Sequence, residues 1–194
     1  MKHQAMRALY PLIMKAMKWI GKNSAIVENK TGELFKTPIH NLSVLLNNGK
    51  QLALRELQGK KILFVNTASN CGYTAQYKEL QQLQERHAER LTIIGFPAND
   101  FKEQEKGTDA AIAQFCQVNF GVTFPLAKKS SVVKGTTQHP VYQWLTQREK
   151  NGWNEKSPGW NFSKYLVNEQ GVLTYYFDAA VSPLSPAIEK AING

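Results

Sequence analysis

A strand, a tight turn and a helix follow one another between residues 61 and 88, and this order constrains the fold more than any other feature. Lys61–Val65 is a mostly apolar run of the length of a buried strand. Residues 76–88 repeat apolar side chains at helical spacing, and Leu91–Gly95 is a second apolar run. Strand, helix and strand in this order pair in parallel through a right-handed crossover. The sequence therefore predicts an α/β domain built around this unit.

The segments on either side add a hairpin, more helices and an antiparallel pair of strands. Turn formers at Asn47–Lys50 separate the apolar runs Ser43–Leu46 and Leu52–Leu54, which predicts a β-hairpin before the core unit. Adjacent strands are expected at Lys164–Val167 and Val172–Phe177, paired antiparallel. The expected helices are 108–119 with Thr108 or Asp109 as the cap, one near His139–Arg148, and a last one that starts at Pro183 or Pro186. We therefore expect a central mixed β-sheet with helices on both faces.

The turn between the first strand and its helix, Asn66–Thr74, contains a lone cysteine, Cys71. A thiol at the start of a helix lies near unpaired backbone N–H groups and the positive end of the helix dipole. Such a position favours the thiolate, which is the reactive form of cysteine. The chain has only one other cysteine, Cys116, too few for a disulfide-stapled secreted scaffold. Two distant cysteines suit a redox pair, and the alternative is two buried, inert thiols.

The formal net charge of +9 raises the question of a nucleic-acid or anionic-membrane partner. The basic residues are spread along the chain, and no basic run is interleaved with aromatic residues. We therefore do not expect nucleic-acid binding. A general positive field would instead favour anionic substrates and acidic partner proteins.

Residues 1–22 are expected to form a basic amphipathic extension, followed by one domain over 23–194. Apolar side chains recur there at three- and four-residue spacing, with lysines between them. The longest apolar run, Leu9–Met14, is too short for a membrane span or an ordinary signal-peptide core. The extension either packs on the domain or contacts an anionic membrane surface. We expect a cytoplasmic protein, with a degenerate export signal as the alternative.

Three motifs occur in the order found in one enzyme family. Asn66–Thr74 resembles the pattern N-x-A-S-x-C-G-x-T, and Gly95–Phe101 with Gln104–Glu105 resembles G-F-P-x-N-Q-F followed by Q-E. Trp160–Val167 resembles W-N-F-x-K-F-L-V. These are motifs of the glutathione peroxidase family, and the resemblance runs from about residue 37 to 192.

This resemblance implies a thioredoxin-like fold and the reduction of hydroperoxides to water or alcohols. The reactive residue would be Cys71, which becomes a sulfenic acid. An ordinary thiol is about 3% ionised at pH 7, so full ionisation gains only about thirtyfold. The rest of the rate acceleration must come from hydrogen-bond donors around the sulfur, which the family pattern places at Gln104, Trp160 and Asn161. No metal or prosthetic group is implied, because a thiol reductant acts as co-substrate.

The segment around Cys116 carries a second resemblance. Phe115–Pro125 resembles the F-C-Q-x-N-Y-G-V-T-F-P segment of the thioredoxin-dependent branch of the family. This implies that Cys116 resolves the sulfenic acid as a disulfide, which thioredoxin, or else glutathione, then reduces. If Cys116 lies on a helix far from Cys71, the bridge requires local unfolding, since disulfide Cα atoms approach within about 7 Å. The alternative is a buried structural cysteine.

Two positions depart from the family pattern. Ala98 stands where a cysteine is frequent, which leaves Cys116 as the available resolving residue. Asp100 replaces a glutamine, and a carboxylate that faced the thiol would raise its pKa. We expect Asp100 to cap a turn with Asn99 instead. The short segment between Arg148 and Trp160 lacks the insertion of the tetrameric members, so a monomer is expected.

Two other functions share these features. A peroxide sensor would use the same Cys71–Cys116 chemistry to pass oxidation to a partner protein. A non-enzymatic binding module on a thioredoxin-like scaffold would attach to a membrane through residues 1–22. The intact set of Cys71, Gln104, Trp160 and Asn161 argues against the second alternative.

Overall fold

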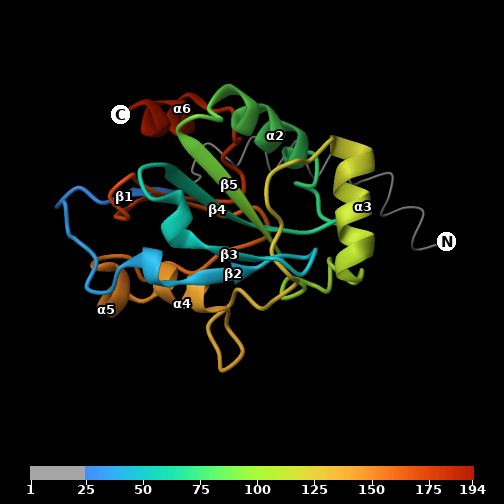
Figure 1. Ribbon diagram of the computed structural model, residues 1–194, viewed down its shortest axis with the longest axis horizontal. Coiled ribbons are helices and arrows are strands. Elements are labelled where there is room, and N and C mark those ends of the chain that lie inside the picture. Colours follow the sequence, from blue (N-terminus) through green and yellow to red (C-terminus); the bar gives the residue numbers. More distant parts are fainter. Residues whose placement is uncertain (1–24) are drawn as a thin grey trace.

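A mixed sheet of five strands forms the centre of the molecule (Figure 1). Figure 1 shows the computed structural model of the chain, in which residues 25–194 are described. The spatial order of the strands is β1 (Ile26–Glu28), β7 (Leu173–Phe177), β6 (Lys164–Val167), β4 (Lys61–Thr67) and β5 (Leu91–Pro97). The β4–β5 pair is parallel and the other pairs are antiparallel. The predicted mixed sheet and its crossover unit are confirmed.

Helices cover both faces of this sheet. Helices α2 (Gln76–Arg86), α3 (Asp109–Phe120) and α6 (Pro186–Asn193) contribute to one apolar cluster. Helix α4 (Pro140–Thr146) contributes to a second cluster on the opposite face. The short helix α5 (Arg148–Asn151) follows α4 directly.

A two-stranded hairpin, β2 (Ser43–Leu45) and β3 (Gln51–Ala53), packs with the α4 side of the molecule. Two 3₁₀ turns, η2 (Ile39–Asn41) and η3 (Leu54–Leu57), flank it. The hairpin was predicted from the turn formers between its strands, and it is confirmed. Strand β1 was not predicted, because its three residues are too few to show a period of two.

Strand β4 joins the two apolar clusters, since every one of its residues is buried. Successive side chains of a strand point to opposite faces, so Leu63 and Val65 pack in one cluster while Ile62 and Phe64 pack in the other. This burial on both faces is typical of a strand in parallel pairing. The strand therefore delivers the loop that follows it to a fixed position at the sheet's end.

The helix ends follow local sequence signals. Thr108 caps α3, and its hydroxyl accepts a hydrogen bond from the Ala111 amide at 3.2 Å. Gly121 ends the same helix with a φ of 64°, which a glycine adopts without strain. The last helix begins at Pro186 with Ser185 as its cap, so the second of the two predicted starts is the right one.

The extension expected at residues 1–22 lies outside the described residues. Within residues 25–194, no helix is both long and apolar enough to cross a membrane.

Candidate active site

The pairing of β4 with β6 brings two of the sequence motifs together. Val65 lies opposite Lys164, and just beyond that pair the Phe162 amide donates to the Asn66 carbonyl at 2.6 Å. The chain that leaves β4 therefore runs beside the chain that enters β6. Cys71 lies on the first of these segments and Trp160 with Asn161 on the second.

The Cys71 thiol is largely buried, with 9% of the residue exposed, and is surrounded by neutral donors. Its Sγ accepts the backbone N–H of Tyr73 at 3.5 Å, and the side chains of Trp160 and Asn161 and the backbone of Gly72 also form hydrogen bonds to it. Burial raises the pKa of the thiol, and these four donors oppose that rise without cancelling it.

The expected backbone N–H donors are present and favour the Cys71 thiolate, but burial outweighs them, so the net shift of the pKa is opposite to the one expected from a helix start. Helix α2 begins at Gln76, and the residues between it and Cys71 form turns. The helix dipole acts mainly within the first turn, whereas desolvation acts on the sulfur itself. Burial of the sulfur was not visible in the sequence pattern.

Gln104 reaches the site through Asn161. Its Oε1 accepts a hydrogen bond from the Asn161 side-chain amide at 3.0 Å, and its backbone carbonyl accepts from the Asn70 amide at 3.1 Å. These contacts hold Asn161 and the Cys71 loop in place. The structure thus brings Trp160 and Asn161 to the sulfur and places Gln104 behind Asn161.

The Trp160 ring has an aromatic and a cationic neighbour. The ring of Phe101 lies 5.5 Å from it between centroids, and the Lys102 ammonium lies 5.7 Å from its centroid. Lys102 and the next residue, Glu103, both have positive φ, 51° and 52°. A strained turn therefore carries a cation to the edge of the site.

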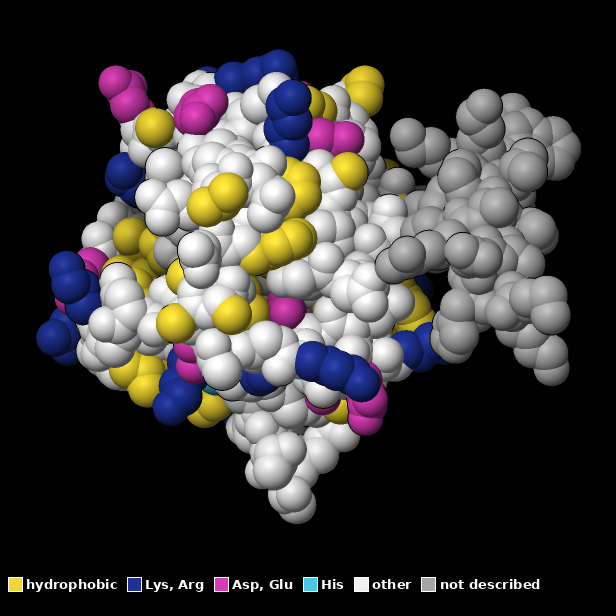
Figure 2. Space-filling view, turned by 90° about the vertical axis from the view of Figure 1, so that its right-hand side faces the viewer, with side chains coloured by type: hydrophobic (Ala, Val, Ile, Leu, Met, Phe, Trp, Pro, Cys, Tyr) yellow, Lys and Arg dark blue, Asp and Glu magenta, His cyan; other side chains and the backbone are white. Residues whose placement is uncertain are grey.

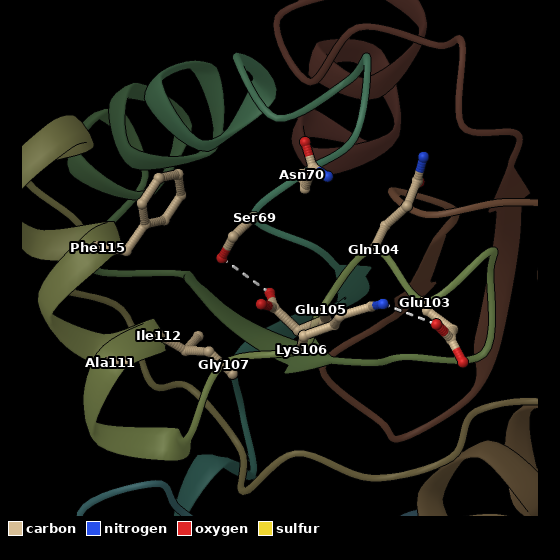
Figure 3. A pocket seen from close by; sticks show the side chains of 10 residues that line it. All are labelled: Ser69, Asn70, Glu103, Gln104, Glu105, Lys106, Gly107, Ala111, Ile112 and Phe115. Carbon is tan, nitrogen blue, oxygen red and sulfur yellow. Dashed lines mark hydrogen bonds and ion pairs between the residues drawn. The ribbon is translucent and has the colours of Figure 1, made fainter. Parts of the chain in front are cut away.

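A cavity of about 460 Å³ opens beside the Cys71 loop (Figure 3). The loop, the segment after β5 and helix α3 contribute its lining: Ser69, Asn70, Glu103, Gln104, Glu105, Lys106, Gly107, Ala111, Ile112 and Phe115. The Glu105 carboxylate accepts a hydrogen bond from the Ser69 hydroxyl at 3.0 Å. Burial raises the pKa of Glu105, and the Ser69 contact opposes this rise. Sequence reasoning noted Glu105 only as part of a motif and missed this link.

Cys116 lies on α3, as predicted, and is fully buried. Both cysteines are free thiols. Burial raises the pKa of Cys116 to about 11, and the Tyr77 hydroxyl opposes the rise. A thiol with such a pKa is almost entirely protonated at neutral pH, so Cys116 is a weak nucleophile in this position.

The two departures from the family pattern are accommodated away from the thiol. The Asp100 carboxylate accepts from the Ser131 hydroxyl and the Val132 amide, both at 2.8 Å. Asn99 separately accepts from the Glu105 amide at 2.9 Å. Asn99 thus caps the turn that ends at Glu105, whereas Asp100 binds a segment some thirty residues further along the chain, so the expectation that Asp100 caps a turn with Asn99 is wrong. Ala98 is buried in the core on the α4 side.

No three His, Cys, Asp or Glu side chains converge as a metal site requires anywhere in residues 25–194. The chemistry that this arrangement supports is that of a thiol. A small electrophile at Cys71 Sγ would meet the indole N–H of Trp160 and the amide of Asn161, which stabilise negative charge without titrating near neutrality.

Comparisons with known proteins agree with this site. The family model described as glutathione peroxidase matches residues 39–146. A glutathione peroxidase-like peroxiredoxin of Chlamydomonas reinhardtii, GPX5, is 42% identical over 157 residues, which cover 79% of this chain and 96% of the relative. The peroxiredoxin HYR1 of Saccharomyces cerevisiae gives the same identity and coverage.

Solved structures support the same fold. The crystal structure of T. cruzi GPX1 has a TM-score of 0.58 at 27% identity and covers 81% of this chain and 94% of its own. A thioredoxin-family thiol:disulfide interchange protein from Chlorobium tepidum has the same TM-score at 16% identity, covering 81% of this chain and 94% of its own, which confirms the thioredoxin-like fold. With the matching family model and the two relatives above 40% identity, the chain belongs to the glutathione peroxidase family.

Proposed function

We propose that the protein is a thiol peroxidase that reduces hydrogen peroxide and organic hydroperoxides. The observation that carries this proposal is the Cys71 thiol, buried among the neutral donors Trp160 and Asn161. The Cys71 thiolate attacks the terminal peroxide oxygen, forms an S–O bond and breaks the O–O bond. Sulfur loses two electrons and becomes a sulfenic acid, and the departing oxygen takes a proton to leave as water or an alcohol. The two donors stabilise the charge on that oxygen.

In the second step Cys116 recycles the oxidised sulfur. The Cys116 thiolate attacks Cys71 Sγ, the S–O bond breaks, and water leaves as the disulfide forms. The high pKa of buried Cys116 makes this step slow unless part of α3 opens and exposes the thiol. This proposal follows from the placement of Cys116 on α3 and from its similarity to the thioredoxin-dependent branch.

A dithiol protein such as thioredoxin would then reduce the disulfide, with glutathione as the alternative reductant. Relatives at about 40% identity are named peroxiredoxins, in agreement with this choice. The exposed side of α3 offers a contact surface, since Val118 is 74% exposed. On the side of the molecule where α3 lies, hydrophobic side chains are interspersed with charges of both signs (Figure 2). This mixed surface suits a protein partner better than a nucleic acid.

We further propose that the protein is a cytoplasmic monomer that uses no bound cofactor. Residues 1–22 would add at most a weak contact to an anionic membrane surface. Flotation with anionic liposomes tests that contact on the full chain and on a chain that lacks residues 1–22. Recovery of both proteins in the bottom fraction would show that the segment makes no such contact.

The test of the peroxidase proposal is NADPH consumption with thioredoxin and its reductase, with hydrogen peroxide or an organic hydroperoxide as substrate. Glutathione with its own reductase is assayed in parallel. Negligible turnover with both reductants would overturn the enzyme proposal and favour the peroxide sensor, which needs no steady-state turnover.

Substitution of the second cysteine separates the two chemical steps. Cys116→Ser should leave the first oxidation of Cys71 within about twofold and abolish turnover with thioredoxin, because the sulfenic acid has no internal partner. Unchanged turnover would mean that Cys116 is not the resolving residue and would make glutathione the preferred reductant.

A further inference from the structure

The turn that presents Trp160 and Asn161 to the sulfur contains a strained residue. Phe162 follows them directly and has a φ of +70°, a region that bulky residues rarely adopt. Its buried ring packs edge-on against Tyr77 at 5.3 Å between centroids. A glycine would adopt this φ without strain but would leave a cavity in the core. For Phe162 such a conformation is unfavourable and persists only where the surroundings impose it.

A buried lysine holds the carbonyl group of this strained residue. Lys164 is completely buried, and its Nζ donates to the carbonyls of Phe162 at 2.8 Å, Val181 at 2.7 Å and Ala179 at 3.4 Å. Three acceptors match the three N–H bonds of an ammonium group. Lys164 therefore ties the donor-bearing turn to the chain that follows β7.

No carboxylate forms a salt bridge with this ammonium among the described residues. The charges that face Lys164 are Glu79 from α2 and Asp178 from the end of β7, and both act at longer range. Burial lowers the pKa of Lys164 to about 7, and the two carboxylates oppose that fall. A buried charge without a direct counter-ion is unfavourable, so its three carbonyl contacts are its main compensation.

The remaining hydrogen bonds of the turn's backbone come from its neighbours in the chain and from β4. The Trp160 carbonyl accepts from the Asn66 side chain at 3.0 Å and from the Ser163 hydroxyl at 2.9 Å. The Phe162 amide donates to the Asn66 carbonyl at 2.6 Å. Lys164 supplies the side-chain contact at the far end of the turn, where the positive φ occurs.

We propose that Lys164 is a positioning residue for the peroxidase site, which fixes the Phe162 carbonyl and thereby aims the Trp160 and Asn161 donors at Cys71. The inference rests on the peroxidase function proposed above. It assigns to the buried ammonium a role in the geometry of the site in addition to its role in packing. Removal of the ammonium should let the turn relax to a common φ and misdirect both donors.

The chain offers a matched control in Lys61. This lysine is also buried, its Nζ donates to the Ile192 carbonyl at 2.9 Å and pairs with the Glu169 carboxylate at 3.5 Å, and it lies at the opposite end of β4 from the Cys71 loop. Lys164→Met and Lys61→Met each remove one buried ammonium and keep a side chain of similar length. Both are made in a Cys116→Ser background so that Cys71 is the sole thiol.

Two properties of Cys71 are then measured in folded protein: the rate of its oxidation by hydrogen peroxide, and its thiolate absorbance near 240 nm against pH. Lys164→Met should slow oxidation at least tenfold and require a higher pH for ionisation, because two donors are lost or weakened. Lys61→Met should stay within twofold of the parent. Equal values for the two variants would overturn the proposal and leave Lys164 a packing residue.

A measurement without a Lys164 substitution covers the case in which Lys164→Met does not fold. In a Cys71→Ser, Cys116→Ser protein labelled with ¹⁵N, the indole N–H resonance of Trp160 should shift with pH with a midpoint near 7 as Lys164 loses its proton. A resonance that is unchanged from pH 6 to 9 would overturn the proposal. Neither this measurement nor the thiolate titration needs turnover, so a protein without peroxidase activity could still confirm the role of Lys164.

Discussion

Removal of the indole donor tests the electrostatic account of Cys71 most directly. Trp160→Phe keeps an aromatic ring against Phe101 and removes the N–H that faces the sulfur, together with part of the indole ring. The burial that raises the pKa of Cys71 then meets three opposing donors in place of four. Ionisation of the thiol should therefore become harder.

The size of the effect follows from the strength of a hydrogen bond to a charged group, about 1.5–3 kcal/mol. Since 1.4 kcal/mol is a factor of ten, the thiolate fraction at pH 7 should fall about 10- to 100-fold. The rate of Cys71 oxidation at pH 7 should fall at least as much, because the same N–H also stabilises the departing oxygen. At a pH where both proteins are fully ionised, the part of the loss due to ionisation disappears.

The assay is the rate of alkylation of Cys71 by iodoacetamide against pH in a Cys116→Ser background, followed by stopped-flow oxidation with hydrogen peroxide. The matched control is Trp153→Phe, which deletes an indole N–H that donates to the Leu173 carbonyl at 2.7 Å, outside the site. The reasoning is refuted if the thiolate fractions of Cys71 at pH 7 in Trp160→Phe and Trp153→Phe agree within twofold.

Two further predictions concern stability. Burial lowers the pKa of His139 to about 4, so between pH 6.5 and 4 the unfolded chain binds a proton that the folded chain does not, and stability falls as the pH falls. From pH 7.5 to 5 the wild type should lose about 1–2 kcal/mol more than His139→Asn in urea unfolding, and parallel losses would contradict this. Lys102→Gly, at a φ of 51°, should be about 1 kcal/mol more stable than Lys102→Ala in the same experiment, because glycine adopts this conformation without strain. Equal stability of the two variants would show that the turn is not strained.

The elements that could be predicted from the sequence are those with a strong local signal. The continuous apolar run of β4 and the helical period in α2 agree with the burial of their residues, and Thr108 acts as the cap that its residue type predicts. Strand β1 exists because β7 offers it a pairing edge, a tertiary cause that three residues do not reveal. The motifs also predicted that Trp160 and Asn161 lie beside the sulfur of Cys71, where the structure places them.

The properties of the site that the sequence did not predict depend on burial. The direction of the pKa change at Cys71 is decided by desolvation, which depends on how residues distant in sequence cover the sulfur. The contact of Gln104 with Asn161, in place of the expected contact with the sulfur, depends on the path of the chain after β5. The burial of Lys164 and its three carbonyl contacts were likewise not predicted, because a lysine within a motif resembles an ordinary exposed polar residue.

A raised pKa at Cys71 is compatible with an efficient peroxidase, because ionisation and reactivity change in opposite directions. A thiolate of higher pKa is more nucleophilic, with a Brønsted coefficient of about 0.4–0.5, so each tenfold loss of thiolate is offset by roughly a threefold gain per thiolate. Each tenfold loss of thiolate therefore lowers the rate only about threefold, against the 100- to 1,000-fold that one preorganised donor contributes to stabilising a developing oxyanion. The same burial excludes water and strengthens the contacts of Trp160 and Asn161 with that oxygen. Burial of the sulfur thus lowers the thiolate fraction but increases the stabilisation of the transition state by more, provided that the turn that holds Trp160 and Asn161 stays rigid.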